Sequence, residues 1–230
     1  LLADAGTPPV ARHAINGCAS TLAFEMSHAS HRIIVNCGGA ATLGGAVPQS
    51  LIKGLRATAA HSTLCLDDTN STAVLPKGKL GKGVGLVEID RRDLDDAVRL
   101  EMSHDGYAKA FGLIHRRILL LRPDGRELRG EDVLVPASRR GKQPGDVPYA
   151  IRFHLGLDAE AHLASDGLGV FLRIADGSLW QFRSMGDSVT LEDSLWVDEH
   201  ARPQPSQQIV LSGTASGGGG SYGWLLKHMG

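Results

Sequence analysis

Hydrophobic and polar residues alternate with a period of two along much of the chain. Between residues 98 and 103, Val, Leu and Met alternate with Arg, Glu and Ser, and residues 170–174 and 179–183 repeat the pattern. This period is typical of a β-strand with one face in a hydrophobic core. Further strand candidates are residues 21–27, 31–36, 62–67, 84–89, 112–122, 148–155, 189–197 and 207–212. None of the chain shows the period of a long amphipathic helix.

Turn-forming residues separate these strand candidates. Asp124-Gly125 and Asp176-Gly177 each lie between two of them, and Asp-Gly favours a tight hairpin because both residues tolerate a positive φ. We therefore predict an all-β fold, a large antiparallel β-sandwich of about a dozen strands. No linker or internal repeat divides the chain, so residues 1–230 are expected to form one domain. Its flexible loops are expected near residues 77–83, 136–147 and 214–221.

Composition narrows the functional classes. The chain has 230 residues, 42% of them hydrophobic, with 5% aromatic residues and a net charge of −1. A nucleic-acid partner is not expected, because such proteins need a basic face with interleaved aromatic residues. No apolar stretch approaches the ~20 residues of a membrane span. The start at Leu1 shows neither an initiator methionine nor a signal peptide, and we expect the chain to be part of a longer protein.

The cysteine spacing and the absence of several known motifs exclude some classes of metal site and enzyme. Cys18, Cys37 and Cys65 match neither a disulfide framework nor a zinc ribbon. Cys37 and Cys65 are interpreted as small buried residues within strands, whereas the environment of Cys18 is left open. The chain lacks a Gly-x-Ser-x-Gly elbow, a P-loop and a Rossmann fingerprint.

The segment from Leu55 to Leu64 concentrates the candidate chemistry. It places His61 at the start of a predicted strand, next to two hydroxyl residues and five residues after Arg56. A neutral imidazole can be a metal ligand or an acid/base group, but a histidine in this position can also cap a strand through hydrogen bonds. Arg56 suits a substrate carboxylate or sulfate, or an internal salt bridge.

The same segment resembles the Arg-x-Thr-x-Ala-His-(Asn/Ser)-Thr signature of heparinase II/III-like polysaccharide lyases. The resemblance continues, in family order, through residues 103–107 (SHDGY), 112–117 (GLIHRR), 148–155 (PYAIRFHL) and 207–213 (QQIVLSG). It implies the C-terminal β-sandwich of such a protein, without the α-helical toroid that precedes it in the family. The implied activity is β-elimination on an acidic, uronic-acid-containing polysaccharide, in the periplasm or cell envelope.

The resemblance also implies a set of site residues. His61 matches a histidine of the active-site cleft that is often a zinc ligand. Asn16 and Cys18 stand where the family has His-x-His, and Asn36 stands at an aspartate. Cys18, Asn36 and His61 are thus the candidate zinc ligands, although asparagine is a poor ligand and Cys18 can equally be an ordinary buried thiol.

The resemblance implies catalytic and substrate-binding roles for three of these residues. His61 and Asn16 are the candidate catalytic residues, with Asn16 neutralising the substrate carboxylate, and Arg56 is the candidate substrate-binding residue. The principal acid and base of the family usually come from the toroid, so this fragment is expected to be inactive alone. A non-catalytic carbohydrate-binding or structural module is the alternative. The remaining candidate residues, expected to be mainly structural, are His104, His115 and His154. His115 and the neighbouring Arg117 are interpreted as basic side chains that reach from a sheet face to solvent.

Overall fold

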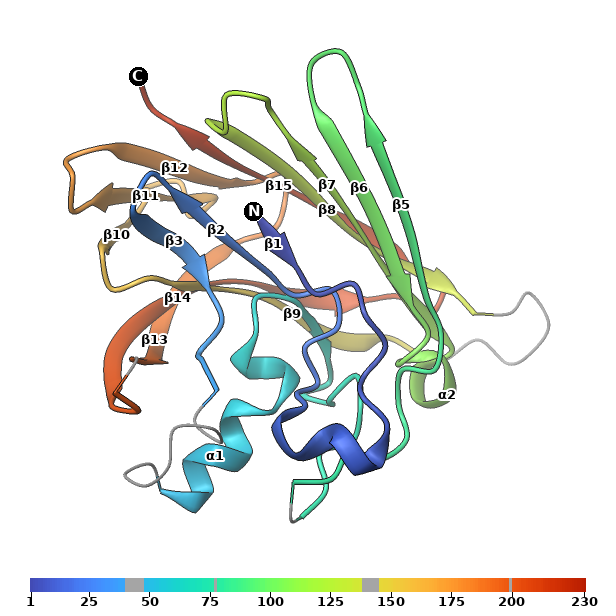
Figure 1. The fold of residues 1–230 in the computed structure, drawn as a ribbon. Helices are drawn as coiled ribbons and strands as arrows, with labels where there is room; N and C mark the ends of the chain where they lie inside the picture. Colours follow the sequence, from blue (N-terminus) through green and yellow to red (C-terminus); the bar gives the residue numbers. More distant parts are fainter. Residues whose placement is uncertain (40–47, 77, 138–144, 199) are drawn as a thin grey trace.

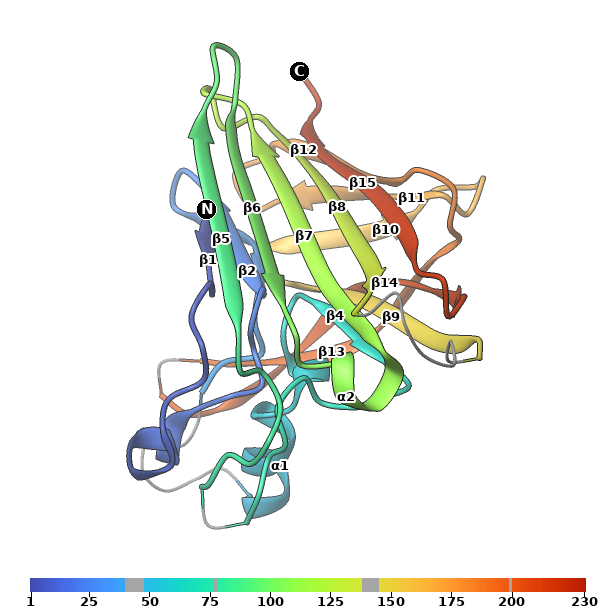
Figure 2. The ribbon, with the colours of Figure 1, turned by 90° about the vertical axis from the view of Figure 1, so that its right-hand side faces the viewer.

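The computed structural model describes residues 1–39, 48–76, 78–137, 145–198 and 200–230, and it shows two antiparallel sheets packed face to face (Figure 1, Figure 2). The predicted all-β sandwich is confirmed. Fifteen strands occur in these ranges, a few more than the dozen expected. Within the same ranges, no helix is long and apolar enough to cross a membrane.

The seven-stranded sheet contains two of the segments that resemble the lyase family, residues 148–155 and 207–213, and the His61 block leads into it. Its strands, in spatial order, are β1 (Leu2–Ala3), β2 (Phe24–His28), β3 (His31–Val35), β9 (Val147–Leu155), β14 (Pro203–Ala215) and β13 (Val189–Val197), with β4 (Leu64–Leu66) pairing β9 beside β3. Because β3 and β4 both pair with β9, the chain segments before and after residues 36–63 lie close together.

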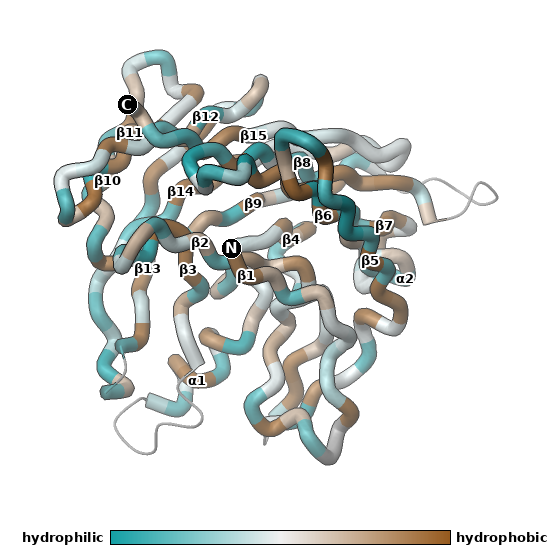
Figure 3. Tube along the Cα trace, turned by 45° about the horizontal axis from the view of Figure 1, so that its top comes forward, coloured by the Kyte–Doolittle hydropathy of each residue, from teal (hydrophilic) through white to brown (hydrophobic). Residues whose placement is uncertain are grey.

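The eight-stranded sheet covers the other side of the core. Its strands, in spatial order, are β10 (Ala159–Leu163), β11 (Gly169–Ile174), β12 (Leu179–Ser184), β15 (Gly220–His228), β8 (Glu127–Pro136), β7 (Leu113–Leu121), β6 (Val98–His104) and β5 (Val87–Asp93). Four of the fifteen strands, β1, β8, β10 and β15, were not among the sequence-based candidates. Hydrophobic and hydrophilic positions alternate along the strands, as the hydropathy colouring shows (Figure 3).

In the part of the chain that the structure describes, the helices are short, and one of them joins β6 to β7 of the eight-stranded sheet. These are the 3-10 helices η1 (Ala11–Asn16) and η3 (Thr58–Ala60), and the α-helices α1 (Gln49–Leu55) and α2 (Ala108–Phe111). In Figure 1 the first of them and α1 lie below the sheets, on the side where β3 ends.

Both predicted Asp-Gly hairpins are present. Gly125 joins β7 to β8 with a φ of 69° and donates its N–H to the Arg122 carbonyl at 2.9 Å. Gly177 joins β11 to β12 with a φ of 88° and donates to the Ile174 carbonyl at 2.9 Å. Left-handed backbone costs glycine little, so the sequence favours a turn at both positions.

The predicted loops are partly described. Residue 77 of the first loop and residues 138–144 of the second lie outside the described residues. In the third loop, Gly219 donates its N–H to the Ser216 carbonyl at 2.9 Å, which closes a tight turn between β14 and β15. The flexibility of these segments stays a prediction.

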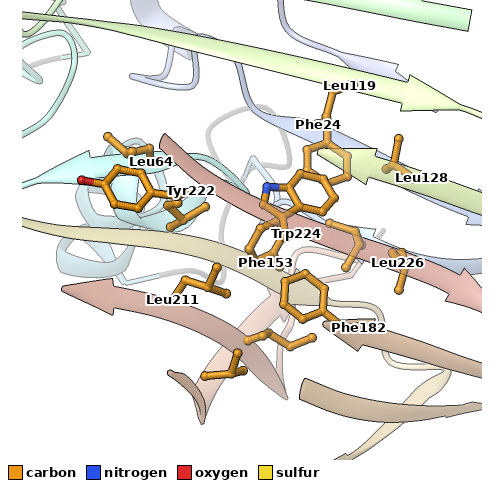
Figure 4. Packing of buried hydrophobic residues seen from close by; sticks show 14 of the residues in the cluster. Phe24, Leu64, Leu119, Leu128, Phe153, Phe182, Leu211, Tyr222, Trp224 and Leu226 are labelled. Carbon is orange, nitrogen blue, oxygen red and sulfur yellow. The ribbon is translucent and has the colours of Figure 1, made fainter. Parts of the chain in front are cut away.

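An aromatic cluster fills the space between the sheets (Figure 4). The Trp224 and Phe24 rings stack with centroids 5.5 Å apart, and Phe153 meets Trp224 edge-on at 4.8 Å. Gly130 lies opposite Trp224 in the register of β8 and β15, and a Cβ there would lie 2.0 Å from the Trp224 Cζ2 atom. The missing side chain of Gly130 therefore makes room for the indole.

Candidate functional site

His61 lies between η3 and β4, at an edge of the seven-stranded sheet. Its backbone is extended, with φ −130° and ψ 149°, and its N–H closes the preceding turn by donating to the Thr58 carbonyl at 3.0 Å. The imidazole Nδ1 lies 2.8 Å from the Ala57 carbonyl, and the residue is only 6% exposed. The ring is thus held in one orientation by the turn that precedes it.

The protonation state of His61 follows from these contacts. A carbonyl can only accept, so the Nδ1 that faces Ala57 carries the ring proton. Burial lowers the pKa of the imidazole, and the Ala57 hydrogen bond and the charges of Asp4 and Glu25 oppose this shift without reversing it. The ring is therefore neutral near pH 7, and its Nε2 keeps a free lone pair. That nitrogen can accept a proton, a hydrogen bond or a metal ion.

The His61 ring lines a pocket of about 420 Å³, called the His61 pocket below. Four of the residues predicted from the family resemblance meet there, because Asn16, Cys18, Asn36 and His61 all line it. Its polar side chains are Asp4, Thr7, Asn16, Cys18, Ser20, Thr21, Glu25, Asn36 and His61. The structure thus brings together residues from η1, the turn before β2, the end of β3 and the start of β4, while their roles stay predictions.

Glu25 is a pocket residue that the sequence pattern did not single out. Its Oε1 accepts hydrogen bonds from the Asn36 backbone N–H at 3.1 Å and from the Asn36 Nδ2 at 3.0 Å. The Asn36 Oδ1 in turn accepts from the Ser62 N–H at 2.9 Å. Asn36 therefore connects a carboxylate on β2 to the segment that carries His61. Only the alternation in β2 hinted at this residue, and alternation does not reveal which pocket a side chain faces.

Arg56 lies behind the pocket wall and is 5% exposed. Its Nε donates to the Gly17 carbonyl at 2.7 Å, and its Nη2 donates to the Ala14 and Gly78 carbonyls at 2.9 and 3.0 Å. These bonds hold the turn that presents Asn16 and Cys18, which differs from both the substrate contact and the salt bridge considered from the sequence. Binding of substrate by Arg56 stays a prediction, and the observed contacts favour a positioning role.

Other residues of the signature also bind the backbone. The Thr58 Oγ1 donates to the Ala19 carbonyl at 2.8 Å, and the Ser62 Oγ donates to the Val35 carbonyl at 2.7 Å. Each bond ties the His61 segment to a chain segment that is distant in sequence. The block therefore joins separate chain segments as well as presenting His61.

A buried ion pair supports the site from the eight-stranded sheet. The Arg117 Nη1 crosses the core and donates to the Leu22 carbonyl at 2.9 Å and to the Ser62 carbonyl at 2.7 Å. Leu22 has a φ of 66°, an unfavourable conformation for a branched side chain, and the Arg117 contact helps to hold it. Arg117 therefore holds the residue after His61 and the turn that leads into β2.

Asp132 fixes Arg117 in turn. Its two oxygens accept from the Arg117 Nε at 2.8 Å and Nη2 at 3.0 Å, from the His115 Nε2 at 2.7 Å and from the Trp224 Nε1 at 3.0 Å. Burial alone would raise the pKa of this carboxyl, but the Arg117 charge and the His115 hydrogen bond hold it well below its usual range. The interpretation of His115 and Arg117 as basic side chains reaching from the sheet to solvent was wrong, because both are fully buried.

The other histidines have structural contacts, as expected. The His104 Nδ1 accepts the Gly106 N–H at 3.0 Å and so fixes the turn after β6. The His154 Nε2 lies 3.0 Å from the Ala59 carbonyl, and its Nδ1 lies 2.8 Å from the Ser194 hydroxyl. Cys37 and Cys65 are buried, although Cys37 follows β3 instead of lying within a strand.

The predicted zinc ligands fit a metal poorly. The described residues contain no group of three or more His, Cys, Asp or Glu side chains placed to hold a metal ion. The Asn36 amide oxygen already accepts from the Ser62 N–H, and burial raises the pKa of the Cys18 thiol, which opposes the thiolate that zinc requires. Of the three predicted ligands, only His61 presents a ligand atom that need not lose a proton and has no hydrogen bond from the described residues.

The double sheet is the fold of a heparinase-type C-terminal sandwich. The chain matches the family described as heparinase II/III-like, C-terminal, over residues 1–225. It belongs to that family, and the domain is thus related to domains of polysaccharide lyases.

Solved lyases share the fold. A heparan sulfate lyase from Pedobacter heparinus superposes with a TM-score of 0.71 at 14% identity, covering 92% of this chain and 30% of that one. A heparinase III gives a TM-score of 0.69 at 13% identity, over 95% of this chain and 31% of that one. At these identities the likeness concerns the fold alone.

A curated relative is closer in sequence. The FtsZ-localized protein C of Caulobacter vibrioides is 34% identical over 222 residues, which is 92% of this chain and 37% of the relative. The chain therefore spans little more than a third of that relative and about 30% of the solved lyases.

Proposed function

We propose that this domain forms one wall of a glycan-binding cleft in a larger heparinase II/III-like protein. The His61 pocket carries the proposal, because it combines an oriented imidazole with several polar side chains at the edge of the sandwich. The N-terminal α-helical toroid found in the family would supply the opposite wall, and an acidic polysaccharide is the expected substrate. Membership of the family supports both expectations.

Eliminative cleavage is the reaction we propose for the cleft. In a β-elimination, a base takes the proton beside the uronate carboxylate, the bond to the leaving oxygen breaks, and an acid protonates that oxygen. His61 suits the role of base because its neutral ring presents Nε2, while Nδ1 is held by Ala57. Asn16 lines the same pocket and can donate a hydrogen bond to the carboxylate.

Binding without cleavage is the second candidate. Elimination needs a group that neutralises the carboxylate, and the described lining of the pocket contains neither Lys nor Arg. The 34% identical relative is named for its localisation with FtsZ. By analogy, this chain would belong to a protein that binds glycan at the cell envelope, at sites of division. A fluorescent fusion of the full-length protein tests that location.

One substitution in the full-length protein separates the candidates. We expect His61→Ala to lower the rate of unsaturated-uronate formation by ~10²–10⁴-fold, the usual contribution of a positioned acid/base group. The lost Ala57 hydrogen bond should lower the free energy of unfolding by only about 1 kcal/mol. His162→Ala is the matched control, because His162 is exposed on β10, away from the pocket.

The outcomes are distinct. Cleavage that is lost in His61→Ala and kept in His162→Ala supports elimination. A wild-type protein that binds polysaccharide without cleaving it, and binds less well as His61→Ala, supports the second candidate. Binding and cleavage that are both unchanged in His61→Ala would reject a role for the pocket in either.

A further inference from the structure

A second pocket, called the Ser194 pocket below, lies next to the turn that precedes His61. It has a volume of about 530 Å³ and is lined by residues of α1, of the η3 turn and of β13. Most of this lining is apolar, with Leu51, Leu55 and Leu195 as its largest side chains. In the described lining, Ser194 carries the only hydroxyl and Asp193 the only charge. Such a pocket suits a hydrocarbon group better than a polar sugar.

The Ser194 hydroxyl contacts a buried histidine behind the pocket lining. The Ser194 Oγ lies 2.8 Å from the His154 Nδ1, and the His154 Nε2 lies 3.0 Å from the Ala59 carbonyl. Because a carbonyl can only accept, Nε2 carries the ring proton and Nδ1 accepts from the Ser194 hydroxyl. Ser194 is half-buried and lines the pocket, whereas His154 is buried and does not. A ligand in the pocket therefore meets a hydroxyl whose proton already points at an imidazole.

These contacts have the geometry of a nucleophile with its general base. Nucleophilic catalysis requires a hydroxyl within hydrogen-bond reach of a base, and a third group that orients the base. The Ala59 carbonyl holds His154 from the position that a carboxylate occupies in Ser-His-Asp triads. The N–H of Leu195, the residue after the serine, donates to the Cys37 sulfur, which lies 3.8 Å from the Ser194 Oγ. That N–H is a donor for the negative oxygen formed when Ser194 attacks a carbonyl.

The surroundings of His154 limit the substrates that such a serine can attack. Burial lowers the pKa of the His154 imidazole to about 4, so the ring is neutral near pH 7 and is a weak base. Proton transfer to a weak base is slow, and the reaction then needs a leaving group that departs with little protonation. The apolar lining adds a preference for a hydrocarbon chain on the acid. Both conditions describe an activated ester of an apolar acid.

We propose that Ser194 is the nucleophile of a second site, which slowly hydrolyses activated esters, such as thioesters or aryl esters, of apolar acids. The Ser194 Oγ attacks the carbonyl carbon while the His154 Nδ1 takes the hydroxyl proton. The bond to the leaving oxygen or sulfur then breaks, and His154 returns the proton to that atom. Water attacks the acyl-serine by the same steps, which releases the acid and restores the serine. This activity goes beyond the proposed glycan-binding function and does not depend on it.

Nitrophenyl esters of different chain length test the proposal with the full-length protein. We expect 4-nitrophenyl octanoate to be hydrolysed faster than 4-nitrophenyl acetate, and Ser194→Ala to abolish this preference together with the activity. His154→Gln should lower the octanoate rate by ~10²–10⁴-fold, the usual contribution of a positioned base. Ser206→Ala is the matched control, because Ser206 lies opposite Ser194 on β14 and donates its hydroxyl to the Leu155 carbonyl instead of a histidine. It should keep the wild-type rate.

An alkyl fluorophosphonate locates the nucleophile independently of turnover. Its phosphorus is attacked by an activated serine with loss of fluoride, and the product stays on the protein. We expect intact mass to show one added phosphonyl group in the wild type and peptide mass to place it on Ser194. Ser194→Ala should not react, Ser206→Ala should react like the wild type, and His154→Gln should react more slowly. Melting curves of the variants check that each of them folds.

The results that would overturn the proposal are equally specific. Octanoate hydrolysis that is the same in the wild type and in folded Ser194→Ala would show that Ser194 is not the nucleophile. A phosphonyl group on another residue, or a wild-type protein that neither hydrolyses the esters nor reacts with the probe, would reject the site. None of these outcomes affects the glycan-binding proposal, which is measured with polysaccharide and His61→Ala.

Discussion

Two polar clusters of this domain contain the same kinds of side chains and behave differently. In the core, Asp132 accepts four hydrogen bonds from Arg117, His115 and Trp224. In the His61 pocket, one oxygen of Glu25 and one nitrogen of His61 have no partner among the described residues. The first cluster is saturated within the protein, whereas the second keeps acceptors for a ligand. The difference lies in burial and in the hydrogen bonds left over, because Asp132 is fully buried and Glu25 is half-buried.

The clusters are also connected. Arg117 binds Asp132 on one side and the Ser62 carbonyl on the other, directly after His61. The core cluster thus fixes the backbone that presents the His61 ring, whose Nε2 has no hydrogen-bond partner among the described residues. The fold supplies the rigidity that a binding site requires, and separate perturbations of the two clusters should therefore have separate effects.

Breaking the core cluster should have the largest effect on stability. Asp132→Ala leaves the fully buried Arg117 without its carboxylate, and we expect the free energy of unfolding to fall by about 3–5 kcal/mol. Urea denaturation measures the change. Glu192→Ala, at an exposed position of β13, should stay within about 0.5 kcal/mol of wild type. A small effect of Asp132→Ala would show that the network does not hold the sheets together.

Acid should lower the stability of the folded domain through a second buried group, His154. Burial lowers the pKa of His154 from 6.5 to about 4, so between these values the unfolded chain binds a proton that the folded chain does not. The free energy of unfolding should therefore fall as the pH drops from 6.5 to 4, by up to about 3 kcal/mol from this residue. His154→Gln should flatten the dependence and His162→Gln should not. Equal slopes in all three proteins would contradict the assignment.

Gly130 tests the packing that surrounds the core cluster. Gly130→Ala places a methyl group 2.0 Å from Trp224, and we expect a loss of about 1–3 kcal/mol together with a change in tryptophan fluorescence. Gly54→Ala is the matched control. A Cβ at Gly54 in α1 meets no atom within 4 Å, so alanine there should stabilise the protein by about 0.4–1 kcal/mol. Equal effects of the two substitutions would argue against the close Trp224 contact.

The smallest effect is expected at the rim of the His61 pocket. Cys18→Ser should change the free energy of unfolding by less than about 0.5 kcal/mol, because the thiol makes one long contact, 3.7 Å to the Asn16 carbonyl. The zinc content of the full-length protein, measured by elemental analysis, should be the same in both forms. Stoichiometric zinc that disappears in Cys18→Ser would restore the metal site implied by the family resemblance.

Sequence patterns predicted most of the sandwich, with informative omissions. The alternation around Met102 and Leu172 predicted strands correctly, because one face of each lies in the core. The strand β15 was missed, although Tyr222, Trp224 and Leu226 alternate within it. Glycines at the start and in the middle of β15 are typical of a flexible segment, which hides the strand pattern. The structure shows that Gly130 on the neighbouring β8 leaves room for the Trp224 indole of β15.

Most of the strands, both Asp-Gly turns and the block around His61 follow from the sequence, because they depend on neighbouring residues along the chain. The partner of each polar group depends on the tertiary structure. That structure placed Glu25 in the pocket, turned Arg56 toward backbone carbonyls and buried Arg117 against Asp132. Hydrogen bonds between residues 11 to 95 positions apart produce those arrangements. Local periodicity carries no information about such partners, since it reports only which face of a strand is buried.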